Sequence, residues 1–353
     1  MGNCAAKPKP RSRLPPLPSK PSPPAVRLYG SESCLCTSLL RLALLYKSVP
    51  FQFFPRDSPL LGRPFLQCGA DTVVGADDTL LREVDSMFPC PPAASPSLEE
   101  ARRRKWQAAA ATTAEEVALA TALQHRSVER HVEELARWAA EMAAGGTEMK
   151  GEAARMGKSY GQLMEVVLEH AQMEERLLFP TLEAAADPDR ALCKVANEEH
   201  GRDLPIINGI MEDIKSTVVM EAGTSFYQEA LRILSSRFKT LEEHFKKHFQ
   251  GEEKNLLPLL EMAITIQREE GEDDSPTVWM NQVMQLMEAT HSPRLFPFFM
   301  AGLLPEEAVQ YIGIICRYTM DQHRLISMLQ SLIIYLETKH TPLGNYNGLL
   351  RRL

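Results

Sequence analysis

The chain has 353 residues, of which 44% are hydrophobic and 24% are charged, and its formal net charge is −7. This length and composition predict about two packed domains and exclude wholesale disorder. Residues 1–25 carry +5 and the remaining residues −12, and an acidic body argues against a dedicated nucleic-acid-binding protein. We find no transmembrane-length apolar run and no secretory signal, and the seven dispersed cysteines favour a reducing, cytoplasmic location.

The first 25 residues contain eight prolines and five basic residues, which predicts a disordered or extended basic tail. Its start, Met1-Gly2-Asn3-Cys4, resembles an N-myristoylation site at Gly2 with a palmitoylation site at Cys4, although Ala6 replaces the usual Ser or Thr. Two acyl chains, or one chain plus the basic patch, would hold the protein peripherally at the plasma membrane. The alternatives are an unmodified tail and an organellar transit peptide.

Residues 26–90 show a mixed pattern of strands and helices. It predicts a small α/β domain that ends in a segment rich in Pro, Ala and Ser. The expected elements are strands at 26–30 and 50–54, helices at 33–47 and 80–87, and a hairpin near 64–74.

Residues 97–266 are helical almost throughout, beginning with a capping box at Ser97 and Glu100. Short breaks separate long helices, which predicts an up-down-up-down four-helix bundle. The fold class is therefore mainly α, with a small N-terminal α/β domain. The expected helices are 98–110, 113–144, 149–183, 189–219 and 225–264, followed by a linker at 267–276, C-terminal helices at 277–340 packed on the bundle, and a tail at 341–353.

The bundle contains an internal repeat. The fourteen residues that begin at His170 align without a gap with the fourteen that begin at His248. Both copies read H-x-x-x-E-E, with a proline ten residues after the histidine. Each copy also follows a single helical histidine, His125 or His200, at a similar distance. A doubled pattern of this length indicates a symmetric site.

Helical periodicity places four histidines and two glutamates of this repeat on inward, otherwise apolar faces, and places His131 on the outside. Buried ionisable groups need a common partner, and a pair of metal ions satisfies them together. Imidazole and carboxylate ligands suit iron, with manganese or zinc as alternatives. His244 is an additional candidate ligand, and Glu175 and Glu253 are expected to support ligands or to be solvated. The expected ligands are His125, His170, Glu174, His200, His248 and Glu252.

These residues resemble the hemerythrin-like (HHE cation-binding) domain over about residues 101–266. The resemblance implies two iron ions bridged by Glu174 and Glu252, and a protein that binds O₂ or responds to oxygen, iron or nitric oxide. Oxygen carriers have a further histidine where this chain has Leu204, and they end in H-x-x-x-x-D. The six-ligand form is more similar to iron and oxygen sensors, so we expect a protein that binds or senses iron, O₂ or a related diatomic molecule rather than an enzyme. We assign no catalytic residues.

Residues 26–89 resemble the thioredoxin-like N-terminal domain of glutathione transferases. This resemblance implies a thiol or glutathione site at Ser31, Ser33 and Cys34, with Pro64 before the third strand. The pair that holds glutathione in the family is replaced here by Ala76-Asp77. Two alternative functions remain at this point: a glutathione-dependent transferase-like or redox protein, and an interaction protein that a metal stabilises.

Overall fold

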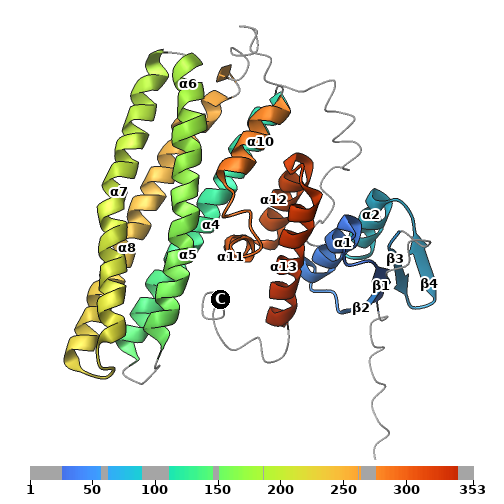
Figure 1. The fold of residues 1–353 in the computed structure, drawn as a ribbon, viewed down its shortest axis with the longest axis horizontal. Helices are drawn as coiled ribbons and strands as arrows, with labels where there is room; N and C mark the ends of the chain where they lie inside the picture. Colours follow the sequence, from blue (N-terminus) through green and yellow to red (C-terminus); the bar gives the residue numbers. More distant parts are fainter. Residues whose placement is uncertain are drawn as a thin grey trace, which may run out of the picture.

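A computed structural model describes residues 26–56, 63–89, 111–145, 151–185, 187–260, 262–263 and 276–340. The fold is mainly helical with one small sheet, as the sequence predicts (Figure 1). None of the described helices is both long and apolar enough to cross a membrane. Several predicted features lie outside the described residues: the tail with Gly2 and Cys4, the helix at 98–110, the linker at 267–275 and the tail at 341–353.

A four-stranded sheet forms the N-terminal part of the chain, with strand order β2-β1-β3-β4. Strand β1 pairs parallel with β2 and antiparallel with β3, and β3 pairs antiparallel with β4. Helices α1 and α2 supply the apolar side chains that bury one face of this sheet, among them Leu40 and Val84. The elements are β1 Val26–Gly30, α1 Leu35–Tyr46, β2 Phe51–Pro55, β3 Phe65–Cys68, β4 Asp71–Val74 and α2 Asp77–Met87.

Four long helices lie side by side in a bundle (Figure 1). Helix α4 packs between α5 and α8, and α7 packs between the same two helices on the other side. The apolar stripe of each helix faces the common core, where Leu135, Leu163, Ile210 and Phe238 are fully buried. The helices are α4 Ala111–Ala144, α5 Glu152–Met173, α7 Asp187–Val219 and α8 Ser225–Asn255.

The proline of each repeat copy interrupts its helix. In an α-helix, Pro180 would lose the hydrogen bond to the carbonyl of Arg176 and its ring would clash with that oxygen. The chain instead widens into a π-helical turn at Glu174–Leu178 before α6, Phe179–Ala185. In the second copy, Pro258 lies in a 3₁₀ turn at Leu257–Leu259. The expected single helices at 149–183 and 225–264 are therefore each divided close to a predicted metal ligand.

The C-terminal helices cover one side of the bundle, and their apolar side chains join the same core. Helices α10, α11 and α12 pack on α4, and α13 lies between them and α1 (Figure 1). Ser127 of α4 donates a hydrogen bond to the carbonyl of Phe299, and Arg130 donates one to the carbonyl of Gly302. The elements are α10 Pro276–Leu286, α11 Phe296–Ala301, α12 Pro305–Tyr318 and α13 Gln322–His340.

This C-terminal layer explains why the prediction for His131 was wrong. The side chain does point away from the bundle interior, but it is only 1% exposed. Its ring stacks on Phe298 at 4.1 Å and its Nε2 atom lies 2.9 Å from the Phe298 carbonyl oxygen. A prediction based on one helix cannot include a covering helix that is distant in sequence.

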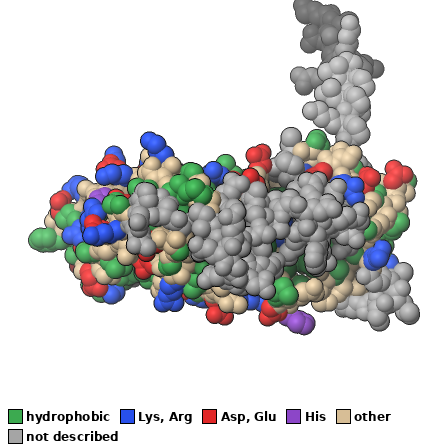
Figure 2. All heavy atoms as spheres, turned by 90° about the horizontal axis from the view of Figure 1, so that it is seen from above, with side chains coloured by type: hydrophobic (Ala, Val, Ile, Leu, Met, Phe, Trp, Pro, Cys, Tyr) green, Lys and Arg blue, Asp and Glu red, His purple; other side chains and the backbone are tan. Residues whose placement is uncertain are grey.

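Helix α13 joins the bundle side of the molecule to the small sheet domain. Arg41 of α1 forms an ion pair with Glu337 at 2.6 Å, and Gln330 donates a hydrogen bond to the Glu32 carbonyl. Leu42 and Leu45 of α1 belong to the large core that contains the bundle. On the face shown in Figure 2, acidic and basic side chains of the described residues are interspersed.

Candidate metal centre

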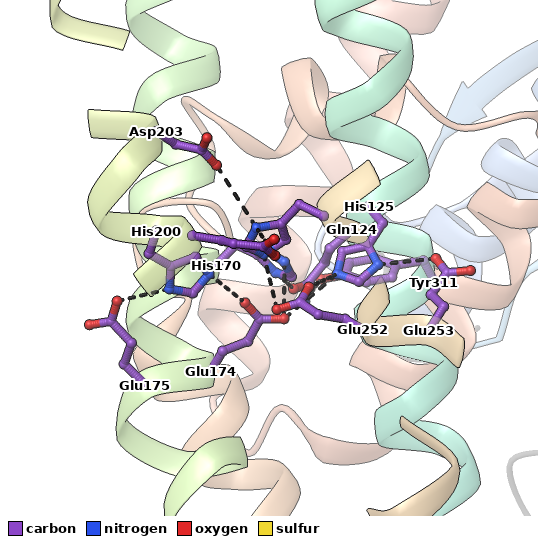
Figure 3. A network of polar contacts seen from close by, with 12 residues as sticks. Gln124, His125, His170, Glu174, Glu175, His200, Asp203, Glu252, Glu253 and Tyr311 are labelled. Atoms are coloured by element: carbon purple, nitrogen blue, oxygen red, sulfur yellow. Dashed lines mark hydrogen bonds and ion pairs between the residues drawn. The ribbon is translucent and has the colours of Figure 1, made fainter. Parts of the chain in front are cut away.

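The six predicted ligands meet inside the four-helix bundle (Figure 3). They form two groups of four, and each group offers ligand atoms that all lie within 4.8 Å of one another. Both groups contain the same two glutamates, so the two candidate sites are adjacent and share their carboxylates. The first group is His125, His170, Glu174 and Glu252, and the second is Glu174, His200, His248 and Glu252.

Each shared glutamate turns its two oxygens toward different histidines. Glu174 Oε1 lies 3.3 Å from Nε2 of His170, and its Oε2 lies 3.4 Å from Nε2 of His200. Glu252 repeats this arrangement with Oε2 at 3.5 Å from Nε2 of His125 and Oε1 at 3.0 Å from Nε2 of His248. A carboxylate whose oxygens face two sites is placed to bridge two ions.

The inward atoms of this cluster lack ordinary hydrogen bonds. Nε2 of His125, His170 and His248 and both oxygens of Glu252 are buried without a hydrogen-bond partner among the described residues. Leaving several buried polar atoms unsatisfied costs free energy, and native proteins avoid it unless another partner is present. All of these atoms are good metal ligands, so the residues fit a pair of bound cations.

The electrostatics of the cluster show strong competition for protons. Burial lowers the pKa of His125, but the carboxylates of Glu174 and Glu253 outweigh burial and raise this pKa to about 9. His200 behaves similarly, with burial opposed by Glu174, and its pKa also rises to about 9. Burial dominates at His170 and lowers its pKa to about 3. Groups that depend so strongly on one another's charge are typical of functional sites.

The two carboxylates themselves differ in acidity. Burial favours the neutral form of Glu174, but the surrounding histidines, His170 foremost, hold its pKa well below the ordinary value. Burial, assisted by the charge of Glu174, raises the pKa of Glu252. Two close carboxylates repel when both are ionised, and cations between them would remove this conflict.

The outer nitrogens of two histidines each face a supporting carboxylate. Nδ1 of His125 lies 3.0 Å from Glu253, and Nδ1 of His200 lies 2.8 Å from Glu175. Such contacts fix the ring and leave Nε2 free to bind a metal. Glu175 and Glu253 directly follow the ligand glutamates in the repeat. Each contacts a histidine of a neighbouring helix, which fits the predicted role of supporting a ligand rather than that of a solvated charge.

Two further supports extend the symmetry and were missed from the sequence. Nδ1 of His170 forms a 2.7 Å hydrogen bond with Gln124 Oε1, whereas Nδ1 of His248 has Glu199 Oε2 nearby at 3.6 Å but makes no hydrogen bond among the described residues. Gln124 and Glu199 directly precede His125 and His200. Extending the repeat alignment to the upstream histidines and one residue before them would have found both. The symmetry is incomplete, because one support is a neutral amide and the other a carboxylate.

Helix α7 turns Asp203, and not Leu204, toward the site. Leu204, one turn after His200, is 44% exposed. Its neighbour Asp203 is buried instead and lies 3.9 Å from Nδ1 of His248. His244 is outside both ligand groups: its side chain is 46% exposed and its Nδ1 lies 3.4 Å from Asp203. Among the described residues, His244 is thus linked to the centre through Asp203.

An aromatic ring closes the interior of the centre. Phe249 stacks on His125 with a centroid distance of 4.2 Å and an interplanar angle of 6°. It also meets His170 and His248 edge to face. The ring restricts the orientation of three ligands and keeps their surroundings apolar, which strengthens electrostatic interactions within the site.

The N-terminal candidate residues lie in another part of the molecule, where β1 meets α1. The hydroxyls of Ser31 and Ser33 are 3.0 Å apart, and Cys34 directly precedes α1. Pro64 is buried near Gly30, because a Cβ atom on that glycine would lie 3.2 Å from the proline ring. Ser31, Ser33 and Cys34 therefore lie close to one another and Pro64 lies beside Gly30, and in the described part of the chain none of them contacts the metal centre.

Comparison with known proteins agrees with this geometry. No curated protein and no solved structure matches the chain significantly. Residues 120–260 match the family model described as the hemerythrin HHE cation binding domain. This stretch contains all six residues of the two ligand groups. The bundle is thus a hemerythrin-like segment whose His and Glu clusters fit metal binding.

Proposed function

We propose that the chain binds two iron ions inside the bundle and uses them to bind or sense iron, O₂ or a related diatomic molecule. The sharing of Glu174 and Glu252 between the two ligand groups carries this proposal. Two ions held by common bridging carboxylates influence each other's charge and ligand affinity. Imidazole nitrogen with carboxylate oxygen favours iron, and manganese or zinc are the alternatives.

The protein's own residues hold and shield the site. Each ion would receive two histidine nitrogens and an oxygen from each bridging glutamate, which leaves positions for an external ligand. Iron would supply a change between Fe²⁺ and Fe³⁺. Phe249 excludes bulk water beside three of the ligands, and the buried surroundings favour a small uncharged molecule such as O₂.

The first test is metal analysis of the full-length chain produced with ample iron. We expect about two irons per chain, and Mössbauer spectra of ⁵⁷Fe-labelled protein should show a magnetically coupled pair. Joint replacement His170→Ala and His248→Ala should abolish iron binding, whereas His244→Ala should retain it. One bound ion, or two irons without coupling, would contradict the shared centre.

A glutathione-dependent function is the second candidate, because Ser31, Ser33, Cys34 and Pro64 lie together at the start of α1. The expected observation is glutathione binding, measured by calorimetry, that persists in the His170→Ala and His248→Ala protein. The third candidate is an interaction protein whose metal only stabilises the fold. It requires a redox-silent ion such as zinc in protein purified from its natural host.

We further propose that acylation at Gly2 and Cys4 attaches the chain to the cytoplasmic face of the plasma membrane. The sequence of the first four residues and the basic tail support this proposal. Fractionation of cells that express the chain should recover it with membranes, and Gly2→Ala should release it. Import into an organelle would overturn this location.

A further inference from the structure

A buried chain of hydrogen bonds leaves the metal centre and enters the C-terminal helices. Gln124 links His170 to Tyr311 of α12, since its Oε1 lies 2.7 Å from His170 Nδ1 and its Nε2 donates to the Tyr311 hydroxyl at 3.2 Å (Figure 3). The Tyr311 hydroxyl lies 2.9 Å from Nε2 of His291. All four side chains are almost fully buried.

We propose that Gln124, Tyr311 and His291 are positioning residues of the metal centre: they determine which nitrogen of His170 carries its hydrogen, and they report metal occupancy to the C-terminal helices. This inference rests on the proposed metal centre. The inference follows because hydrogens can be distributed in only a few ways along this chain of four hydrogen-bonded side chains.

With a metal at His170, the direction of every hydrogen bond is determined. A metal needs the lone pair of Nε2, so the hydrogen of the neutral ring must be on Nδ1. Nδ1–H donates to Gln124 Oε1, which leaves the amide NH₂ of Gln124 to donate to the Tyr311 oxygen. The Tyr311 hydroxyl then donates to Nε2 of His291, whose hydrogen must be on Nδ1.

Without a metal, the opposite direction is favoured. Nε2 of His170 lies 3.3 Å from Glu174 Oε1, and a hydrogen on Nε2 would satisfy that carboxylate. Nδ1 then becomes an acceptor, so the Gln124 amide turns over and donates to it. Tyr311 donates to the amide oxygen and accepts from Nε2–H of His291. Both arrangements contain the same number of hydrogens, so the change needs no net proton uptake.

The hydrogen-bond chain has two alternative directions because its last two residues, Tyr311 and His291, stay neutral. Burial, with Arg324 nearby, lowers the pKa of His291 to about 3, and the Met284 backbone carbonyl opposes this shift only in part. Burial also raises the pKa of Tyr311, which therefore keeps its hydroxyl hydrogen. Neither residue can resolve a mismatch by ionising, so a change of hydrogen position at His170 must reach His291.

The backbone around His291 is held from both sides. Glu169, which precedes His170, accepts hydrogen bonds from the backbone N–H groups of Ala289 and Thr290 at 2.6 Å each. On the other side, Arg324 of α13 donates to the His291 carbonyl at 3.1 Å. The hydrogen-bond chain thus ends at a fixed segment in contact with α13, the helix that packs on α1.

Nuclear magnetic resonance of the full chain tests this inference directly. The ¹⁵N-labelled protein is compared metal-free and loaded with zinc, which is diamagnetic and accepts the same ligands. Long-range ¹H–¹⁵N spectra distinguish the two neutral tautomers, and His291→Gln identifies the His291 signals. We expect hydrogen on Nε2 of His291 without metal and on Nδ1 with zinc. An unchanged His291 tautomer in protein that has bound two zinc ions would overturn the inference and leave the metal centre standing.

Removal of one hydroxyl tests the same link. Tyr311→Phe should weaken zinc binding about tenfold at one of the two sites and uncouple the His291 tautomer from metal occupancy. Tyr318→Phe is the matched control, because Tyr318 lies on the same helix and its hydroxyl donates to Glu116 instead. Equal zinc affinities of the two variants would contradict the positioning role. Failure of the unaltered chain to bind two metals would instead refute the proposed centre.

Discussion

Glu174, in the π-helical turn that follows α5, and Glu252 of α8 face each other, and each presents one oxygen to each histidine pair. They occupy equivalent positions in the two copies of the repeat, 78 residues apart. The repeat therefore produces a shared pair of bridges rather than two separate sites. The ligand variants should show this difference between shared and unshared residues.

Replacement of a shared ligand should have a larger effect than replacement of an unshared one. His170→Ala removes a ligand from one group only, so about one metal per chain should remain bound. Glu174→Ala removes a ligand from both groups and should reduce binding to well below one. Metal analysis after dialysis measures both. Equal metal content in the two variants would show that Glu174 is not a bridge.

The supporting carboxylates should control metal affinity without binding the metal. Glu253→Ala leaves Nδ1 of His125 without its 3.0 Å partner, and loss of such a contact weakens metal binding by about 10- to 100-fold. Glu253→Gln retains an acceptor and should recover part of the affinity. Glu243→Ala, at an exposed position of the same helix, is the control. Competition with a chromophoric chelator gives the affinities.

Metal removal should destabilise the bundle. Each ion that binds only the folded state, at a free concentration a thousand times its Kd, contributes about 4 kcal/mol. Without them the buried carboxylates and histidines lose their common partner, so chelation should lower the melting temperature. Thermal unfolding followed by circular dichroism measures this shift. The His170→Ala and His248→Ala protein should show no response to chelator, and an equal response there would mean that the ions act elsewhere.

Acid should destabilise the contact between α4 and α11 through His131. Burial lowers the pKa of His131 to about 4, with the hydrogen bond to the Phe298 carbonyl as a smaller opposing effect. The unfolded chain, with a histidine pKa of about 6.5, binds more protons below that pH, so the free energy of unfolding falls as pH decreases from about 6.5 to about 4.

The expected loss from this residue is about 2 kcal/mol between pH 7.5 and pH 5. Urea unfolding at both pH values, with chelator present, should therefore show a smaller decrease for His131→Gln than for the unaltered chain. The glutamine can still bond to the Phe298 carbonyl but does not titrate. An identical decrease in both proteins would mean that His131 is not buried in the neutral form.

Local sequence patterns predicted most of the helices and the six His and Glu residues that the structure groups inside the bundle. Apolar periodicity determines which face of a helix is buried, so it placed His125, His170, His200 and His248 on inward faces. The gapless repeat made their grouping recognisable without knowledge of the three-dimensional arrangement. The same patterns predicted the strands of the small domain, because β-branched and aromatic residues alternate there between turn residues.

Other features depended on segments that are distant in sequence. Asp203 and Tyr311 belong to no recognisable sequence pattern. Their roles arise only because helix packing brings Asp203 near His248 and Tyr311 near Gln124. His131 is buried by α11, which follows it by more than 160 residues. Periodicity within one helix specifies a face, whereas the partner of that face depends on how all the helices pack, and only the tertiary structure decided that.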